Sequence, residues 1–429
     1  MNIRKELPKL VNADVISQET ANKIINYYTI KSEQSSNRLQ LVFGVLGVVL
    51  IGLGVILILA HNWDELSRPQ KTAIAFLPLV AGQLLCGFIY LKKPDNITWK
   101  EGSGLFLFFS VGATLSMVSQ TYNIPGNLGP FLLTWMILSL PLIYVMKSSF
   151  VSLFYITGIT WFACETGYWS YPTEHPTLYW ILLAGVLPYY YLLAKNHPQS
   201  NITGFHHWFI PLSVTIALGT NASSAPELMV AAYFSLFGLY YLTGISSYFS
   251  GQDLIRNGYK ITGTVGMIIL LLALSFSEFW DHLSRTNFLS NEIITAPELY
   301  ATLIITALSV WLFTTHQKGR NLRDIKPLSI AFIPFLALFT YGLLYPGAEI
   351  LINLMVFLIG ILMILDGAKQ NSLRALNFGM TILVALIICR FFDFQFSFVA
   401  RGLLFVLAGA GFIAANYWML KIRGVNESS

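Results

Sequence analysis

The placement of basic residues between long apolar runs constrains this chain more than any other feature. Of the 26 Lys and Arg residues, 21 fall into alternate gaps between these runs. Basic residues concentrate in the cytoplasmic loops of membrane proteins, so this alternation indicates helices that cross a bilayer repeatedly in a fixed orientation. The chain is therefore predicted to be an all-α, polytopic integral membrane protein.

The composition supports the same class. Hydrophobic residues make up 55% of the chain and charged residues only 11%, against about 25% charged in an average soluble domain. The net charge of +5 comes from basic residues scattered singly through short loops, so we expect the lipid bilayer and no nucleic acid as partner. The three cysteines have no CxxC spacing, and neither a disulfide framework, a metal site nor a cofactor is predicted.

Fourteen apolar runs are predicted to span the membrane, with both termini in the cytoplasm. Several runs are shorter than the roughly 20 residues that a straight span needs. The weakest run covers residues 208–218. If this run did not cross the membrane, the later basic residues would lie outside, against the positive-inside rule. With all fourteen spans in place, only Arg68, Lys71, Arg285, Arg390 and Arg401 are external. The runs cover residues 41–60, 72–91, 104–122, 131–145, 150–164, 178–193, 208–218, 228–248, 261–279, 299–313, 328–344, 348–365, 375–388 and 403–417.

The chain divides into three parts by composition. Residues 1–40 are polar, show no cleavable signal peptide and are predicted to form a cytoplasmic helical hairpin, with Ser17 as the N-cap of its second helix. A cytoplasmic protein could bind this hairpin. Residues 41–423 form the predicted transmembrane helical domain, and residues 424–429 form a cytoplasmic tail.

Polar residues at membrane depth are the best functional clue, because placing them there costs free energy that function or packing must offset. They form three groups at run ends, all on the predicted external side. Each group alone could be a helix cap, a turn or an ordinary ion pair. If the groups meet, they line one outward-facing cavity. The candidate binding residues are His61, Trp63, Asp64, Gln120, Tyr122, Asn123, Arg390, Asp393 and Arg401.

Four stretches of the sequence resemble a known family of bacterial membrane proteins, the domain of unknown function 2157. They read LVNADVISQETANKIINYY, AHNWDELSRPQK, SQTYNIPGN and, near the C-terminus, RFFDFQFSFVARGLLFVLAGAGFIAAN. The resemblance is strongest from about residue 8 to 130 and over the last fifty residues. It implies a multi-pass protein of the bacterial inner membrane with a cytoplasmic N-terminal helical segment, and it implies no established activity.

Three functions are compatible with these observations. In the first, which we prefer, the outer cavity binds or transports a small polar or anionic solute or a lipid head group, with Arg390 and Arg401 as anion partners. In the second, the protein is a membrane enzyme that acts on a lipid-linked substrate, as glycosyltransferases do, with Asp64 and Glu65 holding a metal or acting as base. The third is a membrane scaffold without catalytic activity. No catalytic residue is assigned.

Overall fold

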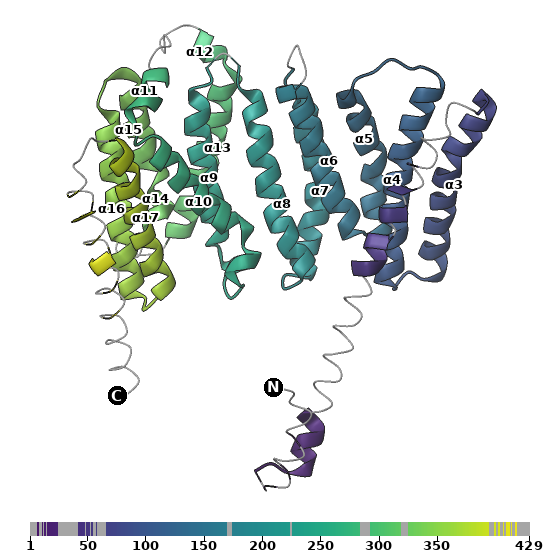
Figure 1. The fold of residues 1–429 in the computed structure, drawn as a ribbon, viewed down its shortest axis with the longest axis horizontal. Coiled ribbons are helices and arrows are strands. Elements are labelled where there is room, and N and C mark those ends of the chain that lie inside the picture. Colours follow the sequence, from purple (N-terminus) through teal and green to yellow (C-terminus); the bar gives the residue numbers. More distant parts are fainter. Residues whose placement is uncertain are drawn as a thin grey trace. The chain divides into compact units, whose positions relative to one another are not determined.

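A computed structural model shows the chain as a series of helices (Figure 1). It describes residues 66–169, 174–223, 225–283, 292–318 and 325–393, together with isolated stretches of residues 7–57 and 399–417. Every described element of secondary structure is helical. The all-α prediction is therefore confirmed.

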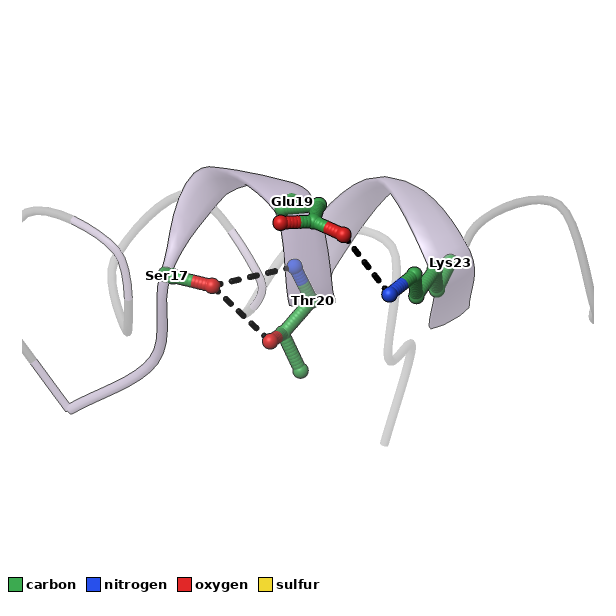
Figure 2. A network of polar contacts seen from close by, with 4 residues as sticks. All are labelled: Ser17, Glu19, Thr20 and Lys23. Carbon is green, nitrogen blue, oxygen red and sulfur yellow. Dashed lines mark hydrogen bonds and ion pairs between the residues drawn. The ribbon is translucent and has the colours of Figure 1, made fainter.

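The predicted cap in the N-terminal segment is present. Residues 18–24 are helical, and the backbone N–H of Thr20 donates to Ser17 Oγ at 3.2 Å (Figure 2). This bond satisfies one of the donors that the first turn of a helix leaves free. One turn later, Lys23 Nζ lies 2.7 Å from Glu19 Oε1 on the exposed face. Ser17 is thus the N-cap that the sequence predicts.

The chain divides into two compact units. Unit 1 comprises Met1–Phe162 and Leu182–Tyr189, and unit 2 comprises Ala163–Ile181 and Tyr190–Ser429. Unit 1 contains α3 (Arg68–Lys92), α4 (Ile97–Thr121), α5 (Leu128–Met146) and most of α6 (Ser149–Cys164). The middle of α7 (Thr177–Asn196) also belongs to it.

Helices α3, α4 and α5 run side by side and are joined by short loops (Figure 1). Asn96 caps α4 by accepting the backbone N–H of Trp99 at 3.1 Å. At Gly82 an added Cβ would lie 3.2 Å from the Leu107 backbone, so the glycine lets α3 approach α4 closely. Close approach of this kind increases the van der Waals contact between helices, which helps to hold them together in lipid, where no hydrophobic driving force acts between them.

Unit 2 is built around a large apolar core. Phe234 and Phe335 stack with ring centroids 3.7 Å apart, and Phe332 and Phe339 are buried beside them. Its elements in chain order are η2 (Glu165–Trp169), the ends of α7, α8 (Asn201–Leu218), η3 (Gly219–Asn221), α9 (Leu228–Gly244), η4 (Ser247–Phe249), η5 (Leu254–Arg256), α10 (Gly258–Ala273), α11 (Ser277–Leu283), α12 (Glu292–Thr295), α13 (Pro297–Gln317), α14 (Pro327–Ile330), α15 (Phe332–Leu344), α16 (Ala348–Lys369) and α17 (Leu373–Asp393).

The apolar runs between residues 72 and 388 coincide with these helices, although some bounds differ. The run 228–248 stops being α-helical at Gly244, where an added Cβ would lie 2.5 Å from the Lys260 backbone nitrogen. The run 261–279 breaks after Ala273, and the run 328–344 breaks at Ala331. Among the described helices, 7 are long and apolar enough to cross a membrane. The count of fourteen spans stays a prediction, because other apolar helices are shorter than a span needs and parts of the first and last runs lie outside the described residues.

Candidate functional site

A cleft in unit 1 is a candidate binding site. It lies between α3, α4 and α5 and is closed at one end by the loop that joins α4 to α5. Its volume is about 880 Å³, within the range of about 300–1,000 Å³ that is typical of small-molecule pockets. The residues that line it are Phe76, Leu79, Gln83, Val111, Thr114, Leu115, Ser116, Val118, Ser119, Gln120, Ile124, Pro125, Gly126, Asn127, Leu128, Pro130, Phe131, Thr134 and Leu138.

Three amide side chains face this cleft from three different elements. Gln83 comes from α3, Gln120 from the last turn of α4, and Asn127 from the N-cap position of α5. None of the three amides forms a side-chain hydrogen bond with another described residue. Each amide offers two donors and one acceptor. The cleft therefore presents hydrogen-bonding capacity that the described part of the protein does not itself use.

Some hydroxyl groups in the lining, in contrast, already donate hydrogen bonds to backbone carbonyls. Thr114 Oγ1 donates to Ala75 O at 2.8 Å and so ties α4 to α3. Ser119 Oγ donates to Ile124 O at 3.2 Å and holds the closing loop. No lining residue carries a charge. The cleft can thus bind a ligand through neutral hydrogen bonds and apolar contact rather than through ion pairing.

Trp135 fixes α5 against α4 next to the cleft. Its Nε1–H donates to Phe108 O at 2.8 Å, and its ring covers Gly112, where an added Cβ would lie 2.6 Å from Cε2. Phe131, which lines the cleft, packs on the same indole with ring centroids 5.8 Å apart. The wall formed by α5 is therefore held by an aromatic contact and a partly buried hydrogen bond.

The structure brings part of one predicted polar group, which consists of Gln120, Tyr122 and Asn123, to this cleft. Gln120 lines it. The Tyr122 hydroxyl lies 3.0 Å from Thr72 Oγ1, which joins the loop to α3, and Asn123 adopts a left-handed conformation with φ 49° in the turn. Since α4 ends at Thr121, these residues form a helix end followed by a turn. Tyr122 and Asn123 do not line the cleft.

Another predicted polar group, which consists of Arg390, Asp393 and Arg401, belongs to unit 2. Arg390, near the end of α17, donates from Nη2 to Ser275 Oγ at 3.1 Å, and its guanidinium carbon lies 4.6 Å from the centroid of the Phe276 ring. Asp393 is the last residue of α17, but its side chain lies outside the described residues. His61, Trp63, Asp64 and Arg401 also lie outside them. A cavity shared by all three groups stays a prediction.

Glu101 is a buried polar residue that the sequence did not single out. It lies in the second turn of α4 and is 6% exposed. Its Oε1 accepts the backbone N–H of Ser149 at 2.9 Å, and its Oε2 accepts that of Phe150 at 3.1 Å and the hydroxyl of Ser148. A negative group at a helix N-terminus satisfies free donors and complements the helix dipole. Glu101 therefore caps α6, and no local pattern around it indicates this role.

Residues 8–152 match the family described as predicted membrane protein DUF2157. The chain resembles this family. The match includes every residue that lines the cleft and ends close to the start of α6. No curated protein and no solved structure matches the chain. The family match and the apolar helices identify a multi-pass membrane protein, and the resemblance of the last fifty residues stays a prediction.

Proposed function

We propose that the cleft of unit 1 binds a small polar molecule or a lipid head group as a step in recognition or transport. The observation that carries the proposal is the convergence of Gln83, Gln120 and Asn127, without partners among the described residues, on one cleft of about 880 Å³. All three side chains are exposed, so their amide donors and acceptors are open to a bound molecule. A molecule with hydroxyl, amide or phosphate-ester oxygens would form hydrogen bonds with them.

The basic residues support an external position for the cleft. Lys92, Lys93 and Lys100 surround the loop between α3 and α4, which the positive-inside rule places in the cytoplasm. The loop that closes the cleft lies at the other ends of these helices. The ligand would then enter from the outer side or laterally from the outer leaflet of a bacterial inner membrane.

Native mass spectrometry tests this proposal. The full chain is reconstituted into nanodiscs of phosphatidylethanolamine and phosphatidylglycerol and released from them in the spectrometer. We expect the wild-type protein to retain one lipid or one co-purified polar molecule, whose mass identifies it. Gln120→Ala removes one amide, and Thr134→Trp fills the cleft, so both should lose this adduct. Asn377→Ala, an exposed amide on α17, is the matched control and should keep it.

Two outcomes would contradict the proposal. Wild-type protein without any retained molecule would show that the cleft does not bind one stably. Equal retention by wild type and Thr134→Trp would show that the adduct lies elsewhere. The enzyme alternative depends on Asp64 and Glu65, which lie outside the described residues, so no observation made on the structure favours it.

A further inference from the structure

One face of α3 passes through the cleft of unit 1 and continues beyond it. Phe76, Leu79 and Gln83 line the cleft, and Gly87 and Tyr90 follow them at helical spacing. Residues at i, i+3, i+7, i+11 and i+14 share one face of a helix. We call these five residues the cleft face of α3. The cleft face therefore extends from the cleft to the last turn of the helix.

Gln83 lies far from both ends of α3. The helix runs from Arg68 to Lys92, so at 1.5 Å per residue Gln83 lies about 22 Å from its start and about 14 Å from its end. The hydrocarbon core of a bilayer is about 30 Å thick. Polar side chains at such a depth mark the paths of polar substrates in membrane proteins. The cleft thus carries a hydrogen-bonding side chain into the interior of the membrane.

Polar side chains of the lining lie at successive depths between the closing loop and Gln83. Gln120 is in the last turn of α4 and Asn127 is the N-cap of α5, so both lie at the end closed by the loop. Ser116 lies about one turn deeper on α4, and Thr134 about two turns deeper on α5. Thr134 Oγ1 donates to the carbonyl of Pro130 at 2.8 Å and can still accept a hydrogen bond. A polar group moving inward would therefore find a partner every one or two turns.

The cleft is open along its side as well as at its outer end. Phe76 on α3 is 44% exposed and Leu138 on α5 is 53% exposed, although both line the cleft. Thr134 is exposed between them. In a bilayer, hydrocarbon chains would cover this open side. A molecule in the cleft can therefore keep a polar part among the amides and an apolar part in the lipid.

Beyond Gln83 the cleft face remains open. Nothing lies within 4 Å of a Cβ added at Gly87. Tyr90 is exposed and lies in the last turn of α3, at the depth where tyrosine hydroxyls reach the membrane interface. Arg68 begins the helix and Lys92 ends it. A phosphate group would therefore meet a cationic side chain at either end of this face.

We propose that unit 1 moves phospholipids between the two leaflets, with the polar head group sliding along the cleft face of α3 while the acyl chains stay in the bilayer. The cleft supplies the outer half of the path, and Gly87 and Tyr90 supply the inner half. Lipid moves down its own gradient, so no bond forms or breaks and no energy source is needed. This proposal rests on the cleft as the binding site of the proposed function, and it names the ligand class as a phospholipid.

The chemistry of the cleft favours a lipid over a water-soluble solute. Most of its lining is apolar and its side is open to hydrocarbon, which suits a molecule that keeps its chains in the bilayer. A head group that crosses bare hydrocarbon loses its hydrogen bonds to water, and the polar side chains of the cleft replace them. No lining residue is charged, so no ion pair holds the head group inside the path.

Reduction of a labelled lipid by dithionite tests the proposal. The full chain is reconstituted into vesicles of phosphatidylethanolamine and phosphatidylglycerol that contain a trace of phosphatidylethanolamine with a nitrobenzoxadiazole-labelled acyl chain. Dithionite does not cross the membrane, so in protein-free vesicles it destroys only the label in the outer leaflet. With wild-type protein we expect the label of the inner leaflet to be lost as well, because labelled lipid moves outward.

Variants on and off the cleft face identify the path. Gln83→Leu removes the deepest amide and should slow the loss of inner-leaflet label about tenfold, the effect of one lost hydrogen bond. Gly87→Leu fills the open part of the face and Thr134→Trp fills the cleft, so both should lose most of the translocation. Ala81→Leu adds similar bulk at an exposed position on another face of α3, and Asn377→Leu removes an exposed amide on α17. Both controls should keep the wild-type rate.

Three outcomes would overturn the proposal. The first is wild-type protein that leaves the inner-leaflet label intact; if mass spectrometry still finds a retained molecule, the cleft binds without translocation and the proposed function holds. The second is an equal rate for wild type and Gly87→Leu, which places the lipid path elsewhere. The third is an equal loss of rate in Ala81→Leu and Gly87→Leu. Gly87→Leu adds its side chain in open space, so we expect it to fold, and its thermal unfolding midpoint checks this.

Discussion

Glu101 Oε1 accepts the backbone N–H of Ser149 at 2.9 Å, so the beginning of α4 is tied to the first turn of α6. The two residues are 48 positions apart in the chain. The same carboxylate also binds the N–H of Phe150. This arrangement satisfies two of the donors that every helix start leaves free, in a buried part of unit 1.

Replacing Glu101 should therefore destabilise unit 1. Glu101→Ala leaves two buried N–H groups and one hydroxyl without their partner, and each buried group left unsatisfied costs about 1–3 kcal/mol. The thermal unfolding midpoint in detergent measures the effect. Glu174→Gln, an exposed glutamate, is the control. An unchanged midpoint for Glu101→Ala would show that water or another group replaces the carboxylate.

Glycines at the contact between α16 and α17 should not tolerate a side chain. An added Cβ at Gly379 would lie 2.8 Å from Gly360 O and from Ile364 N, which are backbone atoms and cannot move aside. We expect Gly379→Ala to cost about 1–3 kcal/mol through overpacking. At Gly87 nothing lies within 4 Å of an added Cβ, so Gly87→Ala should be neutral or stabilise α3 by up to about 1 kcal/mol. Equal unfolding midpoints for the two variants would contradict the close contact.

Cysteine labelling tests the orientation that the basic residues predict. In a background with Cys389→Ala, the remaining Cys86 and Cys164 are buried. Gly126→Cys, in the loop that closes the cleft, should react with an impermeant maleimide in intact cells. Asp95→Cys and Val425→Cys should react only after the membrane is permeabilised, because both lie on the predicted cytoplasmic side. Labelling of Val425→Cys in intact cells would show that the number of spans is odd.

Arg390 should be coupled to Asp393, which lies three residues later on α17. Residues at this spacing share a helical face, and an opposite charge lowers the cost of placing each group at membrane depth. Arg390 also binds Ser275 and Phe276. Arg390→Gln and Asp393→Asn should each cost more than the surface-pair value of about 0–1 kcal/mol. A double-mutant cycle measures the coupling, and additive effects would show that the pair does not interact.

The sequence predicted local features well because local forces produce them. The cap at Ser17 and the end of α4 before Asn123 follow from hydrogen bonds between residues a few positions apart. The helices themselves follow from long apolar runs, since a backbone in lipid must satisfy its own hydrogen bonds. The break at Gly244 was missed, because the close contact of Gly244 with the distant Lys260 accompanies it.

The sequence by itself determined that this chain is an all-α membrane protein, where most of its helices lie and, through its basic residues, which orientation to expect. Only the tertiary structure decided that Glu101 caps α6 and that Gln83, Gln120 and Asn127 meet at one cleft. The reason is physical. In lipid the outer face of a helix is as apolar as its inner face, so hydropathy does not reveal how a helix is rotated, and rotation decides which distant side chains meet.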